Sequence, residues 1–181
     1  VMPGTAEDAA GLLVASVRDN NPVLYLENKY LYRRLSAPGK PSLEPIEIGK
    51  ANVVREGTDI TVVTYSAGVH QAVEAAEELA KEGISVEVVD LRTVKPLDIE
   101  TVAESVKKTS RAVILHEAAE FLGMGAEIAT EIQKEAFWYL DQPVERIAAL
   151  NTPTPTSPPL EDAVIPQPAE ILATIRKVAK A

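Results

Sequence analysis

From residue 51 onward, short β-branched runs alternate with amphipathic helical segments, and this alternation restricts the fold more than any other feature of the chain. Predicted strands cover residues 60–65, 86–90, 112–115 and 144–150. Predicted helices cover residues 68–81, a segment that begins at Asp98, residues 123–139 and residues 168–180. Strands that alternate with helices form a mostly parallel sheet with helices on both faces. We therefore predict an α/β fold in three layers.

The first part of the chain carries a shorter pattern. Thr5 followed by Asp8 is typical of a helix start, and the Asp19–Pro22 turn is typical of a helix end. The apolar run 23–26 predicts a buried strand. One helix and one strand cannot enclose a core, because each must bury its apolar face against further elements.

A segment rich in Pro and Gly separates these two parts, and such composition is typical of a linker. We therefore divide the chain into a domain remnant at 1–35, a linker at 36–50 and a complete domain at 51–181.

Composition excludes several classes of function. The net charge is −9, whereas nucleic-acid binding relies on an excess of Lys and Arg. The chain has no cysteine, which removes disulfides, thiolate metal sites and cysteine nucleophiles. No apolar run approaches the roughly 20 residues of a membrane helix, and no basic segment followed by an apolar one opens the chain. We expect no nucleic acid, no membrane and no secretory signal.

The stretch HEAAEF, residues 116–121, resembles a helical zinc motif in which His116, Glu117 and Glu120 are ligands. Such a motif needs its ligands on one helical face, but this stretch follows a predicted strand and precedes two glycines. We therefore favour a strand-to-helix connection over a metal site. The carboxyl ends of parallel strands commonly bind ligands, so a crevice role for this segment stays open.

Other patterns point more weakly to chemistry. Gly123 and Gly125 open a helix as in dinucleotide-binding turns, but Ile128 stands where the third glycine would be, so close helix–sheet packing explains them better. Ser66 lacks the first glycine of a nucleophile elbow.

The 91–98 loop has two readings. In the simpler one, Arg92 pairs with a carboxylate and Asp98 caps the following helix; in the other, the loop contacts an anion or a partner. The Asp19–Pro22 turn is a helix stop whose oxygen atoms could also line a cation site.

Several strings then identify a family. LLVASVRDNNPVLYLENKYLYR resembles the end of the pyrimidine-binding domain of the β-subunit of 2-oxo acid dehydrogenases. TDITVVTYSAGVHQAVEAAEEL, VEVVDLRTVKPLDIETVAESVKKTSR, GMGAEIATEI, FWYLDQPVERI and LEDAVIPQPAEI are similar to successive parts of its transketolase C-terminal domain. The resemblance covers nearly the whole chain in order.

The resemblance implies membership of a thiamine diphosphate-dependent enzyme of the pyruvate, branched-chain or acetoin type, which decarboxylates a 2-oxo acid and passes the acyl group to lipoamide. The activating glutamate of the family and the active-site histidine of its β-subunit have no counterpart here. Glu27 lies too late to be that glutamate, and His70 and His116 match no catalytic position. The α-subunit holds the diphosphate and its magnesium. We therefore expect no catalytic or cofactor-binding residue in this chain.

The resemblance implies a binding role for two groups of residues. Relatives bind a monovalent cation such as potassium at the turn after the first helix, and the matching residues are Ser16, Val17, Asp19 and Asn21. Relatives also bind the subunit-binding domain of the dihydrolipoyl acyltransferase near the C-terminus of the β-subunit, where Asp141 and the terminal carboxylate of Ala181 match the contacts. Each also has a simpler reading, a helix stop and a solvated loop acid.

The family's assembly implies an α-subunit and a second β-subunit as partners, in the cytoplasm or, in a eukaryote, in the mitochondrial matrix or plastid. The alternative is a stand-alone α/β module for assembly or for binding a small molecule.

Overall fold

The computed structural model describes residues 1–36 and 39–181, so Ala37 and Pro38 of the predicted linker lie outside the described residues. In this part of the chain a five-stranded sheet has the order β1-β3-β2-β4-β5. The strands are β1 Asn52–Arg55, β2 Ile60–Thr64, β3 Val86–Asp90, β4 Ala112–Ala119 and β5 Glu145–Ala149. Strands β2 to β5 are parallel, and β1, which the sequence pattern did not predict, is antiparallel to β3. The mostly parallel sheet is confirmed.

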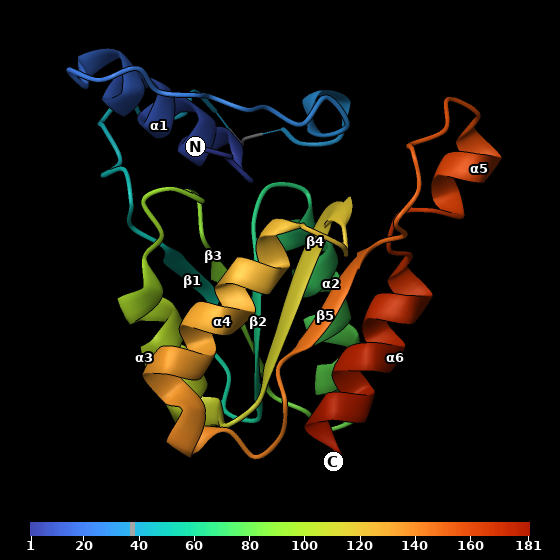
Figure 1. Ribbon diagram of the computed structural model, residues 1–181. Coiled ribbons are helices and arrows are strands. Elements are labelled where there is room, and N and C mark those ends of the chain that lie inside the picture. Colours follow the sequence, from blue (N-terminus) through green and yellow to red (C-terminus); the bar gives the residue numbers. More distant parts are fainter. Residues whose placement is uncertain (37–38) are drawn as a thin grey trace.

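Four helices form the outer two layers (Figure 1). α2 Gly68–Ala80 and α6 Pro168–Ala179 pack together on one face, and α3 Ile99–Thr109 and α4 Met124–Ala136 pack on the other. The predicted helix at 123–139 ends earlier, because Phe137–Tyr139 forms a 3-10 turn. A further 3-10 turn, Leu31–Arg33, and a short helix, α5 Pro158–Asp162, lie outside the layers. The three-layer α/β fold is confirmed.

A hydrophobic core fills each side of the sheet. Between the sheet and the α2–α6 pair, the core includes Leu79, Ile171 and Ile175. Between the sheet and the α3–α4 pair, it includes Ile114 and Ile128. All five side chains are fully buried, and each such burial stabilises the fold by roughly 1.5–3 kcal/mol.

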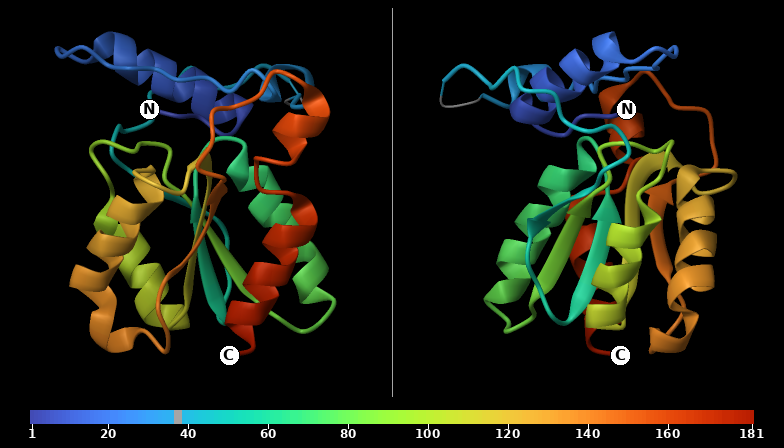
Figure 2. Two further views of the ribbon diagram at one scale, coloured as in Figure 1. Left: turned by 45° about the vertical axis from the view of Figure 1, so that its right-hand side comes forward. Right: turned by 90° about the vertical axis from the view of Figure 1, so that its left-hand side faces the viewer.

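The N-terminal segment, residues 1–36, lies across the carboxyl ends of the central strands (Figure 2). Its helix, α1 Ala6–Arg18, begins at Thr5, whose hydroxyl oxygen accepts the amide of Asp8 as the sequence pattern predicted. The Met2 amide donates to the Arg92 carbonyl (2.8 Å), just after β3. The sheet therefore has one edge covered by this segment, the carboxyl edge, and an opposite amino edge where the strands begin.

The predicted buried strand at residues 23–26 is wrong. These residues are extended, but they form no strand, and Leu24 is 79% exposed. The Val1 amino group donates to the Leu24 carbonyl (2.7 Å), and the Leu26 amide donates to the Val1 carbonyl (3.0 Å). An apolar run becomes a strand only where a neighbouring strand completes its ladder, and Val1 is too short a partner.

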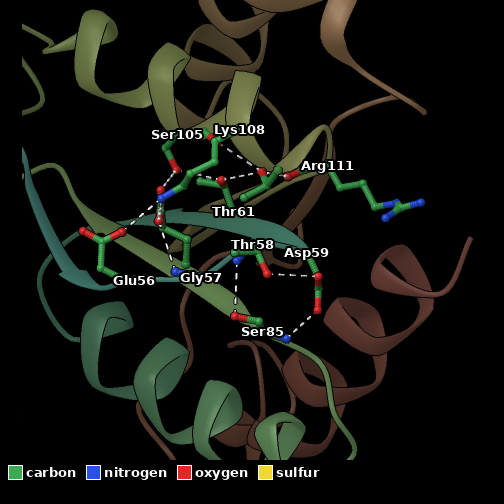
Figure 3. Close-up of polar contacts among 11 residues, drawn as sticks. Glu56, Gly57, Thr58, Asp59, Thr61, Ser85, Ser105, Lys108 and Arg111 are labelled. Atoms are coloured by element: carbon green, nitrogen blue, oxygen red, sulfur yellow. Dashed lines mark hydrogen bonds and ion pairs between the residues drawn. The ribbon is translucent and has the colours of Figure 1, made fainter.

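A buried polar network joins α3 to the amino edge (Figure 3). Glu87 of β3 is 1% exposed, and its carboxylate accepts hydrogen bonds from Ser105 Oγ (2.5 Å), from the Gly57 amide (3.1 Å) and from Lys108 Nζ. The Thr61 hydroxyl lies 2.7 Å from Ser105 Oγ, which extends the network to β2. Both oxygens of the buried carboxylate are thus satisfied, and Lys108 balances its charge.

Across residues 1–36 and 39–181, none of the helices combines the length and the apolar composition that a membrane crossing requires.

Candidate functional site

The carboxyl edge holds a crevice between the sheet and the N-terminal segment. A cavity of about 370 Å³ is lined by Met2, Glu27, Asn28, Lys29, Tyr65, Ser66, Glu117 and Ala118. The Asn28 side-chain amide donates to Glu117 Oε2 (2.9 Å), and burial raises the pKa of Glu117. The structure therefore brings Glu117 to the predicted position at the carboxyl edge, and its role as a ligand group stays a prediction.

His116 and Glu117 lie inside β4, which continues to Ala119, so the stretch 116–120 is mostly strand. The His116 side chain is 1% exposed, and its Nε2 accepts the amide of Gly125 (3.1 Å) at the start of α4. Burial lowers the pKa of His116, so the neutral ring carries its proton on Nδ1. His116 is therefore a cap for α4.

Gly125 is required by the same contact. A Cβ added at Gly125 would lie 2.3 Å from His116 Nε2, closer than atoms can approach. A Cβ at Gly123 would lie 2.1 Å from the Ala119 carbonyl oxygen. Close packing of helix on sheet, the explanation favoured for these glycines, is confirmed.

Ser66 adopts a left-handed backbone conformation with a φ of 56°. Its side chain is buried, and within the described residues its Oγ has no hydrogen-bond partner. His70 Nε2 lies 2.6 Å from the Gly4 carbonyl oxygen, which occupies that nitrogen. Ser66 and His70 therefore do not form a nucleophile–base pair in this arrangement.

The 91–98 loop forms the contacts of its simpler reading. Arg92 Nε lies 2.7 Å from Asp8 Oδ1. Asp98 Oδ1 accepts the amide of Thr101, so Asp98 caps α3. The Asp98 carboxylate also accepts the Ala51 amide (3.0 Å), and such hydrogen bonds hold the pKa of Asp98 below its usual range against the opposing effect of burial.

The residues of the predicted cation site lie together at the end of α1. Asp19 Oδ1 accepts the backbone amide of Asn21 (2.7 Å) and its side-chain amide (3.0 Å). Ser16 Oγ donates to the Leu12 carbonyl (2.6 Å), while Val17 is 78% exposed. Because the Asn21 amide turns to Asp19, it does not close a helical bond to the Val17 carbonyl. Oxygen atoms at a helix end fit a hard monovalent cation.

Asp141 and Ala181 are both exposed. Asp141 lies at the amino edge, beside Ser110 just before β4, and the chain ends at Ala181 on the same side of the sheet (Figure 1). Asp141 Oδ2 is 3.3 Å from Arg111 Nη2, and the Asp141 amide donates to the Ser110 carbonyl (2.9 Å). The Gln142 side chain donates to the Val178 carbonyl (2.7 Å), which ties the loop of Asp141 to the last turns of α6. The two predicted partner contacts thus share one edge of the sheet.

Sequence reasoning missed the buried acids at the carboxyl edge. Asp8 is 2% exposed and Asp90 is 0% exposed. Asp8 was recognised only as part of a helix start, and Asp90 only as the end of a strand. The available signal was an acidic residue at the end of an otherwise apolar strand, because such a residue rarely lies in a core without a partner.

Comparison with known proteins shows which family the chain is related to. The family model described as "Transketolase, C-terminal domain" matches residues 49–171. The pyruvate dehydrogenase E1 component subunit beta of Bacillus subtilis (strain 168) is 47% identical over 178 residues, which cover 98% of this chain and 54% of that protein. The acetoin:2,6-dichlorophenolindophenol oxidoreductase subunit beta of Cupriavidus necator is 44% identical over 180 residues, which cover 99% of this chain and 53% of that protein.

A solved structure agrees with these relatives. The structure titled "Split gene transketolase, inactive beta4 tetramer" superposes with a TM-score of 0.80 at 25% identity, covering 98% of this chain and 56% of that chain. The chain therefore spans about half the length of the curated relatives it matches. It belongs to the transketolase C-terminal domain family, and over almost its whole length it is related to the β-subunits of pyruvate and acetoin dehydrogenases.

Proposed function

We propose that this chain is the C-terminal part of the β-subunit of a thiamine diphosphate-dependent 2-oxo acid dehydrogenase. The complete enzyme decarboxylates a 2-oxo acid oxidatively and transfers the acyl group to lipoamide. One observation carries the proposal: 98% of the chain aligns at 47% identity with 54% of a pyruvate dehydrogenase β-subunit. The matched family model at 49–171 supports the division into 1–35, 36–50 and 51–181.

In this proposal the chain builds the contacts between subunits and holds none of the catalytic groups. Thiamine diphosphate and magnesium bind with the α-subunit, and the assembly also includes a second β-subunit. Within the described ranges, no group of three or more His, Cys, Asp or Glu side chains is arranged for a metal ion. Calorimetry of the isolated chain with thiamine diphosphate and Mg²⁺ should give no binding heat, and a clear saturable signal would contradict this assignment.

We further propose that Ser16, Val17, Asp19 and Asn21 supply oxygen ligands to potassium in the intact β-subunit. Support comes from their common place at the end of α1, where helix carbonyls lack intrahelical partners. Thermal unfolding of the intact β-subunit should occur at a higher temperature in KCl than in choline chloride, and Asp19→Ala should remove most of that difference. An equal difference in the variant would count against Asp19 as a ligand.

The docking surface for the acyltransferase is proposed at Asp141 and the Ala181 carboxylate. Both are exposed at the amino edge, and charged pairs of this kind steer association and fix the orientation of a basic partner. The affinity for the acyltransferase subunit-binding domain should fall by about tenfold or more in Asp141→Lys, because one charge pair is replaced by repulsion.

The matched control is Asp162→Lys, which makes the same charge change at the exposed α5. This variant should bind the subunit-binding domain like the wild type. Equal affinities for the Asp141→Lys variant and the wild type in a calorimetric titration would remove Asp141 from the docking surface.

A further inference from the structure

Two buried carboxylates and one guanidinium meet where α1 crosses the end of β3. Asp8 comes from α1, Asp90 ends β3, and Arg92 follows in the next loop. Arg92 Nε lies 2.7 Å from Asp8 Oδ1, and Asp90 Oδ1 accepts the Arg92 amide (2.9 Å). Because Asp8 and Asp90 are 2% and 0% exposed, a single cation would have to balance two charges taken out of water.

Asp90 also has one oxygen without a partner. Within the described residues, Oδ2 receives no hydrogen bond. It lies against the N-terminal segment, since a Cβ added at Gly4 would be 3.2 Å from Asp90 Oδ2 and 3.1 Å from the Ser66 carbonyl oxygen. Burying an ionised carboxylate oxygen without a hydrogen-bond partner raises the free energy of the folded state. A protonated carboxyl group avoids most of this penalty, because it carries no net charge to desolvate.

The elements around the junction add neutral groups, acids and the cation of Lys29. On α2, His70 contacts the Gly4 carbonyl, and in the extended segment Tyr25 donates to the Ala9 carbonyl (2.7 Å). On β1, Asn52 lies opposite Asp90, and on β2 the neighbour of Asp90 is Thr64. The crevice beside the junction adds the titratable groups of Glu27, Lys29, Tyr65 and Glu117. Two others are nearby on the chain: Glu7, whose carboxylate accepts the Ser42 amide, and His116, which stacks on Tyr65.

We propose that this junction is a proton-operated latch: the Asp8–Asp90 pair holds one proton while residues 1–36 are seated on the sheet, and loss of that proton weakens the seating. The proton resides on Asp90, because the Arg92 guanidinium faces Asp8, whereas Asp90 Oδ2 has no hydrogen-bond partner within the described residues. The latch is independent of the proposed enzymatic function, since it involves only contacts within this chain.

The direction of the pH dependence follows from burial. Desolvation raises the pKa of Asp90 to about 7, and the Arg92 amide opposes this rise only in part. With the segment released, Asp90 is in water and titrates near its ordinary value of about 4. The closed junction therefore binds one more proton than the open one between these values. Closure is favoured most at pH 4 and below, weakens as the pH rises to about 7, and then levels off.

Hydrogen–deuterium exchange of the full chain, followed by mass spectrometry from pH 5 to pH 8, tests the latch. After correction for the intrinsic pH dependence of exchange, protection of α1 should fall on the order of 30- to 100-fold over this range. Protection of α3, which packs on the sheet, should stay constant. Unchanged protection of α1, or an equal fall in α3, would overturn the proposal.

The variant Asp90→Asn keeps the shape of the side chain but cannot ionise, so protection of α1 should become independent of pH. The matched control Asp162→Asn, an exposed acid of α5, should behave as the wild type. Persistence of the full pH dependence in Asp90→Asn would assign it to another group and reject the latch.

Carbon-13 NMR of the aspartate carboxyl groups tests the wild-type chain directly, even if Asp90→Asn does not fold. One aspartate should titrate near neutral pH, well above the ordinary range of an aspartate side chain. If all aspartates titrate below about pH 5, the junction holds no proton and the proposal fails.

Discussion

Strand β3 carries a buried carboxylate near each of its ends, and the two differ in how completely their oxygen atoms are hydrogen-bonded. At the amino edge, Glu87 has hydrogen bonds to both oxygens and a lysine to balance its charge. At the carboxyl edge, Asp90 has one oxygen that accepts the Arg92 backbone amide and one oxygen without a partner in the described residues, while the Arg92 guanidinium faces Asp8. The complete network joins elements of the sheet and its helices, whereas the incomplete one lies at the contact of the proposed latch.

The comparison extends to the surroundings of each edge. The amino-edge network joins α3 to β2 and β3, which belong to one continuous core. The carboxyl edge joins that core to residues 1–36, where Leu24 and Tyr32 are 79% and 61% exposed. A break at the amino edge should therefore lower the stability of the whole domain, and a break at the carboxyl edge should act locally.

The largest effect is expected for Lys108→Met, which leaves Glu87 buried without its cation. The free energy of unfolding should fall by about 2–4 kcal/mol, because removing one partner of a buried pair leaves an uncompensated charge. Denaturant unfolding measures this loss. The control Lys134→Met removes an exposed ion pair with Glu131 and should change the free energy of unfolding far less, because solvent screens such pairs. Similar losses in both variants would mean that the amino-edge network is not special.

An intermediate and local effect is expected for Arg92→Met, which removes the only cation that pairs with Asp8 in the described structure. Exchange protection of α1 should fall at least about tenfold, since two buried acids then face each other. Protection of α3 and β4 should change little, because their core is untouched. A uniform loss of protection across the sheet would show that the two edges unfold together and would break the comparison.

The smallest effect is expected for His116→Phe, which removes the acceptor for the Gly125 amide but keeps an aromatic ring. The free energy of unfolding at pH 8 should fall by about 1–2 kcal/mol, because a buried amide loses its partner.

The stability loss in His116→Phe should also depend on pH. The folded-state pKa of His116 is lowered by burial, so its contribution to stability is present above the unfolded value of about 6.5 and is lost as the pH falls below it. The stability difference between wild type and His116→Phe should therefore shrink from pH 8 to pH 5, as measured by denaturant unfolding. A constant difference would mean that His116 is not held neutral.

Several elements could be predicted because their signals are local. The strands at 60–64 and 86–90 and the helix that begins after Asp98 follow from β-branched runs and from a capping residue. Asp98 and Thr5 act within their own turns, so their roles were readable from neighbours three residues away.

Other features depended on residues far apart in the sequence. Strand β1 has little periodic signal and exists because it pairs with β3. The run at 23–26 has a strong apolar signal and forms no strand, because its ladder is not completed. Among the candidate sites, the sequence pattern predicted that Asp141 lies in a loop. Only the contact between Gln142 and Val178 showed that Asp141 and the C-terminus lie at the same edge of the sheet.

The sequence by itself determined the alternation of strands and helices, and with it the parallel three-layer sheet, because periodicity and capping act over a few residues. The tertiary structure alone decided which acids are buried and which of them have partners. Glu87 meets a lysine 21 positions later, and Asp90 lies against a segment more than 80 residues earlier. Charge balance in a core depends on which distant side chains the fold brings together, and no local pattern records that.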